Sequence, residues 1–174
     1  GKNMQKKVSI FLIAALLIAG FSLISLQQTT VQAEEVGTEI GMKAPDFSLT
    51  NLNGQEVNLS DYRGQKVFLN FWASWCPPCR AEMPDMQKLH EEYDNQVDIL
   101  AINIGENKST AANFMMQNNL DFPVLLDNNK STAQNYLVRG IPTSYFLNQD
   151  GIIKEKVVGA VSYKKMLELT GIKR

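Results

Sequence analysis

The sequence predicts an α/β fold in which helices flank a mixed central sheet. Three observations lead to this prediction. Apolar runs suited to buried strands occur at 66–73 and 97–104, segments with helical spacing follow them, and the chain ends with two strands and a helix. Strands that alternate with helices indicate parallel strands, and a closing hairpin adds antiparallel ones. The fold class is therefore α/β with a mixed sheet.

The first elements lie before and around the pair of cysteines. Residues 46–60 read as two short strands around Asn53-Gly54, a strong hairpin signal. The strand 66–73 is apolar enough to be buried on both faces. The helix after it carries one apolar stripe, and Pro84 is expected to kink this helix unless it begins a second segment. The residues of the stripe are Met83, Met86, Leu89, His90 and Tyr93.

The later elements follow from the same patterns of spacing. A buried strand is expected at 97–104, a helix at 108–119, a short strand at 122–126 and a short helix at 131–137. Residues 143–147 and 151–159 read as antiparallel strands, and 163–169 as a terminal helix.

Residues 1–33 read as a targeting segment that precedes one domain, residues 34–174. Three lysines precede residues 8–26, which carry no charge and as a helix would span about 28 Å, close to the thickness of a bilayer core. A signal peptide cleaved after Ala33 and an uncleaved membrane anchor both fit. The charges predict a domain outside the cytoplasm, tethered to the outer face of the membrane or secreted after cleavage.

Composition and charge exclude some classes of function. The formal net charge is −1, and residues 1–33 hold three of the 17 basic residues and none of the 18 acidic ones. The rest of the chain is therefore acidic, and it has no basic stripe, so nucleic acid is excluded as a partner. A Gly-rich phosphate loop is also missing from the sequence. We expect a monomer.

Cys76 and Cys79 are the only cysteines. A disulfide between them closes a loop worth roughly 2 kcal/mol in the chain-entropy model, against roughly 3 for fifteen residues, so it is a poor structural staple. A zinc site would lack ligands, since His90 is the only further soft candidate. Arg80 stands where a haem c attachment motif needs histidine. A reversible redox disulfide remains, with no metal or other cofactor.

The position of the two cysteines predicts their roles. Cys76 falls where a strand ends and a helix begins, and a helix amino terminus stabilises a thiolate. Cys76 is therefore the predicted attacking sulfur, held exposed and ionisable, and Cys79, one turn later, resolves the mixed disulfide. Pro77 and Pro78 have no N–H to donate, so we expect a moderate lowering of the Cys76 pKa.

Three other features have alternative interpretations in the sequence: Glu82, the Ile141-Pro142 bond and His90. Glu82 is either a buried acid that exchanges a proton with Cys79 or an acid placed for the helix dipole, and the sequence favours neither. The Ile141-Pro142 bond is cis or trans, and cis bonds are about one in twenty before proline. His90 lies about 21 Å along the helix from the first cysteine, so we interpret it as a packing residue.

The motifs together resemble a known family. The segments "FLNFWASWCPPCRAEMP" (68–84), "APDFSLTNLNGQEVNLSDYRGQKV" (44–67) and "GIPTSYFL" (140–147) are similar to the TlpA/ResA family of extracytoplasmic thiol–disulfide oxidoreductases, within the thioredoxin superfamily. The resemblance covers about residues 40–172. It implies a thioredoxin-like fold with an N-terminal β-hairpin and a central βαβ-type insert at roughly 105–130.

The resemblance also implies roles for residues. Pro142 would be cis and face the cysteines, Ile141 would offer backbone bonds to substrate, and Glu82 would be the acid near the resolving cysteine. The residues expected to contact substrate are Trp75, Pro77, Pro78, Ile141 and Pro142. Asn70 stands where ordinary thioredoxins carry a buried aspartate, and two prolines replace the acid that close relatives of ResA often have between the cysteines.

These features predict an enzyme that reduces disulfides in exported proteins with electrons from a membrane-embedded thiol donor. By the resemblance, the expected substrates are apocytochrome c before haem attachment, or spore-envelope proteins. Two alternatives remain open: an oxidant that forms disulfides with the same cysteines, and a peptide-binding or chaperone module without turnover. Leu69 and Ala73 occupy positions where peroxiredoxins need proline and serine or threonine, which disfavours peroxide reduction.

Overall fold

The computed structural model describes residues 35–172, and in this range seven strands form one mixed sheet in the order β2-β1-β5-β4-β3-β6-β7. β3, β4 and β5 run parallel, whereas each of the other neighbouring pairs is antiparallel. The predicted α/β class with a mixed sheet is confirmed. The strands are β1 (Ser48–Asn51), β2 (Glu56–Asn58), β3 (Val67–Trp72), β4 (Asp98–Ile104), β5 (Val124–Asp127), β6 (Thr143–Leu147) and β7 (Ile153–Val158).

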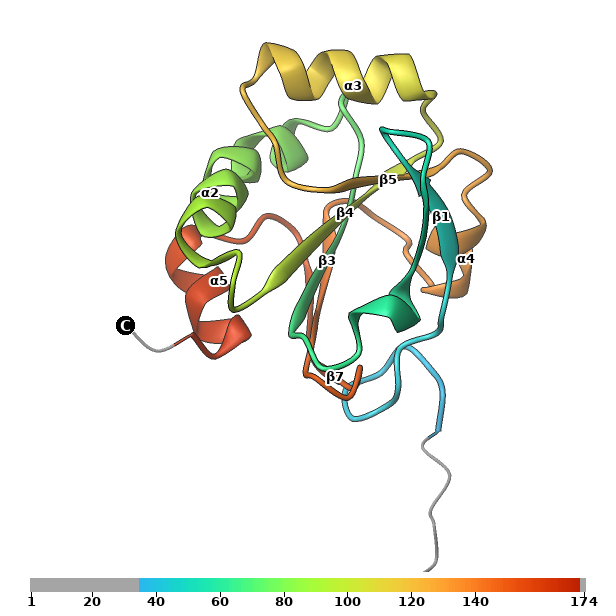
Figure 1. Cartoon of the computed structure of the whole chain (residues 1–174), viewed down its shortest axis with the longest axis vertical. Coiled ribbons are helices and arrows are strands. Elements are labelled where there is room, and N and C mark those ends of the chain that lie inside the picture. Colours follow the sequence, from blue (N-terminus) through green and yellow to red (C-terminus); the bar gives the residue numbers. More distant parts are fainter. Residues whose placement is uncertain (1–34, 173–174) are drawn as a thin grey trace, which may run out of the picture. The chain divides into compact units, whose positions relative to one another are not determined.

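Helices cover both faces of the sheet. Figure 1 shows α2 and α5 side by side on one face and α4 on the other. One hydrophobic cluster joins the sheet to α2, α3 and α5 through residues such as Phe68 and Met86, and a second cluster on the opposite face includes Phe71 and Tyr136. The helices are η1 (Leu59–Tyr62), α2 (Pro77–Tyr93), α3 (Lys108–Gln117), α4 (Ser131–Asn135) and α5 (Tyr163–Thr170).

β3 is an interior strand of the sheet and is buried on both faces, as its apolar sequence predicts. All six of its residues are buried, and it pairs with β4 on one side and β6 on the other. Because successive side chains alternate between faces, Phe68 and Trp72 pack in the cluster beneath α2, and Leu69 and Phe71 pack in the opposite cluster. The buried strand is therefore a rigid support for the short loop that leads to α2.

The N-terminal strands form a hairpin at one end of the sheet. β1 and β2 are antiparallel around Asn53-Gly54, and Gly54 has φ +83°, a conformation that favours glycine. β1 also pairs with β5. The segment 105–130, expected as an insert, contains α3 and β5, and β5 lies parallel to β4.

α2 is one helix of 17 residues and continues through Pro84, so no second segment begins there. Its predicted apolar stripe is buried at Met83, Met86 and Leu89, whereas His90 and Tyr93 are partly exposed. The stripe also buries two polar side chains, those of Glu82 and Gln87, which its apolar pattern does not predict.

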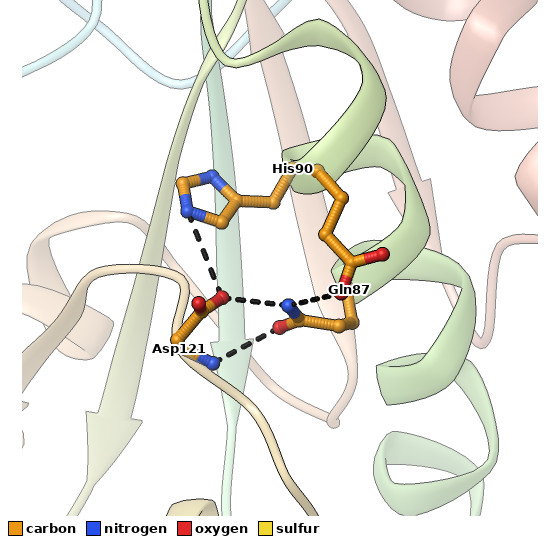
Figure 2. A network of polar contacts seen from close by, with 4 residues as sticks. Gln87, His90 and Asp121 are labelled. Carbon is orange, nitrogen blue, oxygen red and sulfur yellow. Dashed lines mark hydrogen bonds and ion pairs between the residues drawn. The ribbon is translucent and has the colours of Figure 1, made fainter.

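A polar network ties α2 to the loop before β5 (Figure 2). The Gln87 Nε2 donates to Asp121 Oδ1 at 2.6 Å, and the Asp121 N–H donates to Gln87 Oε1 at 3.0 Å. His90 Nε2 lies 3.9 Å from Asp121 Oδ1. His90 therefore belongs to a packing contact between α2 and this loop, in agreement with its interpretation from the sequence.

The targeting segment predicted at residues 1–33 lies outside the described residues. Within 35–172, the helices are all too short or too polar to span a bilayer.

Candidate active site

The site forms where the ends of four strands meet at one edge of the sheet. β3 and β4 are parallel, so their carboxyl ends lie together, and β6 and β7 bring an amino end and a carboxyl end to the same edge because they run antiparallel to their neighbours. In α/β sheets, ligands commonly bind at the carboxyl ends of the parallel strands. Both cysteines follow β3 directly.

Cys76 and Cys79 form a disulfide at the amino end of α2. Cys76 is the N-cap residue of the helix, and its Sγ accepts a hydrogen bond from the Cys79 N–H at 3.3 Å. Pro77 and Pro78 occupy the first two helical positions, where the missing N–H groups leave one backbone donor to the sulfur in place of three. This arrangement fits the expected moderate stabilisation of a Cys76 thiolate.

The exposure of the cysteines corrects one expectation. The sequence-based picture has Cys76 held exposed, but only 3% of its surface is accessible in the disulfide form, and Cys79 is fully buried. The Cys76 Sγ lies 3.6 Å from the carbonyl oxygen of Ile141. Trp75, in contrast, is 68% exposed. Trp75, Pro77 and Pro78 are therefore the exposed residues beside the disulfide, and Cys76 is the less buried of the two cysteines.

The peptide bond between Ile141 and Pro142 is cis. It lies just before β6, beside the cysteines, as the distance from Cys76 Sγ to the Ile141 carbonyl shows. Pro142 is buried, and its carbonyl accepts from the Gly159 N–H at 2.8 Å, whereas Ile141 is half-buried. The structure thus brings together all five residues predicted to contact substrate with Cys76. Contact with substrate itself stays a prediction.

Glu82 is buried at 2% exposure one turn after Cys79. Its Oε1 accepts from Asn70 Nδ2 at 2.7 Å and its Oε2 accepts from the Val161 N–H at 2.8 Å. Burial raises the pKa of Glu82 from 4.5 to about 7; the two hydrogen bonds oppose this rise, and the charge of Asp85 adds to it. Glu82 lies beyond the first turn of α2, which contains no acid, so the helix-dipole interpretation does not hold.

Ser144 is a site residue that the sequence reasoning missed. It lies opposite Asn70 in the β3–β6 register, and Asn70 Nδ2 donates to its Oγ at 3.1 Å. Both residues are fully buried. A serine followed by Tyr145, Phe146 and Leu147 in a short predicted strand is the available signal, because a buried hydroxyl requires a polar partner.

Glu106 is a second missed residue, in the loop after β4. Its carboxylate accepts from the Ser74 N–H at 2.8 Å, the Ser74 Oγ at 2.5 Å and Asn103 Nδ2 at 2.7 Å. Ser74 begins the short loop that carries Trp75 and Cys76. Glu106 therefore fixes the loop that leads to the disulfide. The signal that could have identified it is an acid two residues after the predicted buried strand 97–104. This strand is expected to run parallel to the strand before the cysteines, so the two strands end close together.

A disulfide between closely spaced cysteines at a helix amino terminus, in a thioredoxin-like fold, defines the class of thiol–disulfide oxidoreductases. The chain belongs to the AhpC/TSA family, whose model matches residues 40–156. Within the described residues, no group of three or more histidine, cysteine or acidic side chains is placed to hold a metal ion.

Curated relatives refine this assignment. The chain is 39% identical over 157 residues to the thioredoxin-like protein YneN of Bacillus subtilis, covering 88% of this chain and 91% of that protein. It is 37% identical over 161 residues to the thiol–disulfide oxidoreductase ResA of Geobacillus kaustophilus, covering 91% and 92%. The resemblance to the ResA group is confirmed, and the protein is a thiol–disulfide oxidoreductase of that type.

Solved structures agree with the fold. StoA from Bacillus subtilis matches with a TM-score of 0.65 at 30% identity, over 72% of this chain and 96% of that one. The pneumococcal exposed lipoprotein thioredoxin Etrx1 from Streptococcus pneumoniae matches with a TM-score of 0.62 at 31% identity, over 73% and 98%. The thioredoxin-like fold is thereby confirmed.

Proposed function

We propose that this oxidoreductase reduces disulfides in exported proteins on the outer side of the cytoplasmic membrane. Residues 1–33 serve as its signal peptide or membrane anchor, and residues 34–174 form the catalytic domain. The supports are the charge pattern around the apolar run 8–26, the absence of cysteines other than the redox pair, and similarity to an exposed lipoprotein thioredoxin.

The reaction uses the two sulfurs in sequence. The Cys76 thiolate attacks one sulfur of the substrate disulfide, which forms a mixed disulfide and releases one substrate thiolate. Cys79 loses its proton to Glu82 and attacks the Cys76 sulfur, which closes the enzyme disulfide and releases the second substrate thiolate. Two electrons pass to the substrate, and each released thiolate takes up a proton. A membrane-embedded dithiol donor then reduces the Cys76–Cys79 disulfide.

The observation that carries this mechanism is the environment of Glu82. A carboxyl with a pKa of about 7 is ionised in part of the molecules at neutral pH, so it can both accept and return a proton. Its place one turn after Cys79, on the buried side of α2, suits a proton acceptor for the resolving thiol. When the donor reduces the enzyme disulfide, Glu82 returns the proton to Cys79.

Apocytochrome c before haem attachment and spore-envelope proteins are the proposed substrates. The basis is similarity to ResA and the family resemblance of the motifs. Trp75, Pro77 and Pro78 on the exposed side, with Ile141 and Pro142 beside them, form the proposed surface for an extended substrate segment. The backbone of Ile141, a half-buried residue, supplies the hydrogen bonds to this segment.

The decisive experiment traps the partners. A Cys79→Ala variant expressed in the native host should accumulate mixed disulfides through Cys76, and mass spectrometry identifies the attached proteins. A reduction potential near or below about −270 mV supports the reductase, whereas one near about −120 mV supports the oxidant. Full complementation of a deletion strain by a Cys76→Ser, Cys79→Ser protein would instead support a binding module and reject the redox mechanism.

A further inference from the structure

Asn70, Glu82 and Ser144 form a buried polar cluster between β3, α2 and β6. Asn70 Nδ2 donates both to Glu82 Oε1 at 2.7 Å and to Ser144 Oγ at 3.1 Å. The Asn70 Oδ1 is buried and has no hydrogen-bond partner. Since buried amide oxygens are nearly always paired, this arrangement requires a physical reason.

The two oxygens of Glu82 are not equivalent. Oε2 accepts from the backbone N–H of Val161 at 2.8 Å, and a backbone donor cannot turn away. When Glu82 takes up a proton, the proton is therefore carried on Oε1, the oxygen that faces Asn70. An O–H on Oε1 would then point at the NH₂ group of Asn70, and two donors cannot form a hydrogen bond.

A half-turn of the Asn70 amide resolves this conflict. The turn exchanges Nδ2 and Oδ1, so the side facing the cluster presents two lone pairs in place of two N–H groups. We propose that the Asn70 amide reverses its orientation with the protonation of Glu82. It donates to the carboxylate and to Ser144 in one state, and accepts from the carboxylic acid and the Ser144 hydroxyl in the other.

Asn70 is accordingly a positioning residue for proton transfer, an inference that rests on the proposed role of Glu82. An invertible amide gives each form of Glu82 two well-aligned neighbours without adding a charge to the buried site. An aspartate at position 70 would add a second carboxylate and force the pair to share a proton. A leucine would leave Oε1 without a partner in either state.

The other groups around Glu82 do not replace this function. Asp85 is the acid whose charge acts on Glu82, and its own Oδ2 accepts from the Tyr163 N–H at 2.8 Å. In the oxidised protein the Cys76–Cys79 disulfide does not titrate. The oxidised full-length protein therefore isolates the Glu82 equilibrium from that of the thiols.

Nuclear magnetic resonance of the oxidised protein tests the reversal directly. The side-chain ¹⁵N and ¹H signals of Asn70 should shift between pH 4 and 9, with the same inflection as the Glu82 side-chain carboxyl carbon. In Glu82→Gln, whose side chain cannot ionise, the Asn70 signals should not change over this range. Asn103 offers an internal reference, since its buried Nδ2 also donates to a glutamate, Glu106 at 2.7 Å.

The outcomes separate this inference from the proposed function. If Glu82 titrates and the Asn70 signals stay constant, or if Glu82 does not titrate at all, the reversal is rejected. If the Asn70 signals follow Glu82 but Glu82→Gln reduces substrate at the normal rate, the reversal stands and the proton-transfer role of Glu82 is rejected.

Two variants provide a functional readout. Asn70→Leu removes the partner of Oε1 in both states. Because the hydrogen bond to the charged carboxylate is the stronger of the two, the inflection of the pH–rate profile should move up by roughly one pH unit. Ser144→Ala keeps the amide and its pairing with Glu82, so its inflection should remain close to that of the unmodified protein. An unchanged inflection in a folded Asn70→Leu protein would contradict a positioning role.

Discussion

Two asparagine–glutamate pairs lie on the same face of neighbouring strands and differ in what surrounds the carboxylate. Asn70 and Asn103 are both fully buried, each donates through Nδ2 to a glutamate at 2.7 Å, and each has an unpaired Oδ1. Glu82 is buried on α2 and accepts two hydrogen bonds. Glu106 is half-buried in a loop and accepts three.

The difference shows that the surroundings of an asparagine–glutamate pair determine what the glutamate can do. Burial raises the pKa of Glu82 to about 7, against only two donors, so both of its protonation states are available at neutral pH. Glu106 holds the backbone and side chain of Ser74, and it thereby fixes the loop that leads to Cys76. The Asn70–Glu82 pair is suited to proton transfer, and the Asn103–Glu106 pair holds the loop that carries Cys76.

Exchanging each glutamate for glutamine should produce the largest contrast in rate. Glu82→Gln removes the proton acceptor, so the resolving step should slow by about 100-fold near pH 7, and its pH dependence around 7 should vanish. The measurement is single-turnover reduction of a disulfide peptide by the reduced enzyme. Glu106→Gln is the matched control and should keep the inflection. Equal rates and profiles in the two variants would reject the distinction between the pairs.

The same contrast should appear in stability against pH. The pKa of Glu82 is about 7 in the folded protein against 4.5 ordinarily, so the folded state binds the proton more tightly. Its contribution is fully present below pH 4.5 and is lost as pH rises to about 7, a decrease in unfolding free energy of about 3 kcal/mol. Urea unfolding of the oxidised protein measures it, with Glu82→Gln as reference. A difference between the two proteins that is flat or rises over this range would contradict the buried carboxyl.

The sequence predicts most of the fold because its signals are local. The turn at Asn53-Gly54, the uniformly apolar β3 and the alternation of strands and helices each depend on neighbouring residues, and β1, β2 and β3 fall inside the predicted ranges. The two cysteines at the amino end of α2 are equally local. Their surroundings are not local, because a distant segment brings the carbonyl of Ile141 to within 3.6 Å of the Cys76 Sγ.

The polar partners in the site are long-range and were therefore missed. Ser144 reaches Asn70 from β6, and Glu106 reaches Ser74 from the loop after β4. Neither contact follows from spacing within one element; both depend on the order and register of the strands. For Glu82 the sequence left two interpretations balanced, and the burial that decides between them comes from packing against the sheet and the Val161 segment.

The loop contact at Glu106 should have a smaller effect, on stability and order. An amide in Glu106→Gln cannot accept all three bonds, and it turns an NH₂ group toward one donor. The loss should be about 1–3 kcal/mol, with faster hydrogen exchange at the Ser74 amide. Urea unfolding and exchange measured by nuclear magnetic resonance test this, with the Glu82→Gln protein as the comparison, in which Ser74 should stay protected. An unchanged Ser74 exchange rate would show that Glu106 does not hold the loop.

The smallest effect is expected at a third amide–carboxylate pair, Gln87 with Asp121, where His90 is the nearby titratable group. His90 is 25% exposed and Asp121 76% exposed, with 3.9 Å between Nε2 and Oδ1, so solvent screens the ion pair even when His90 is protonated. His90→Gln should therefore change the unfolding free energy by less than about 1 kcal/mol. Reduction of a disulfide peptide should keep its rate and its inflection near pH 7, because that inflection belongs to Glu82. A shifted inflection in this variant would assign the titration to the histidine and break the contrast between the buried and the exposed pairs.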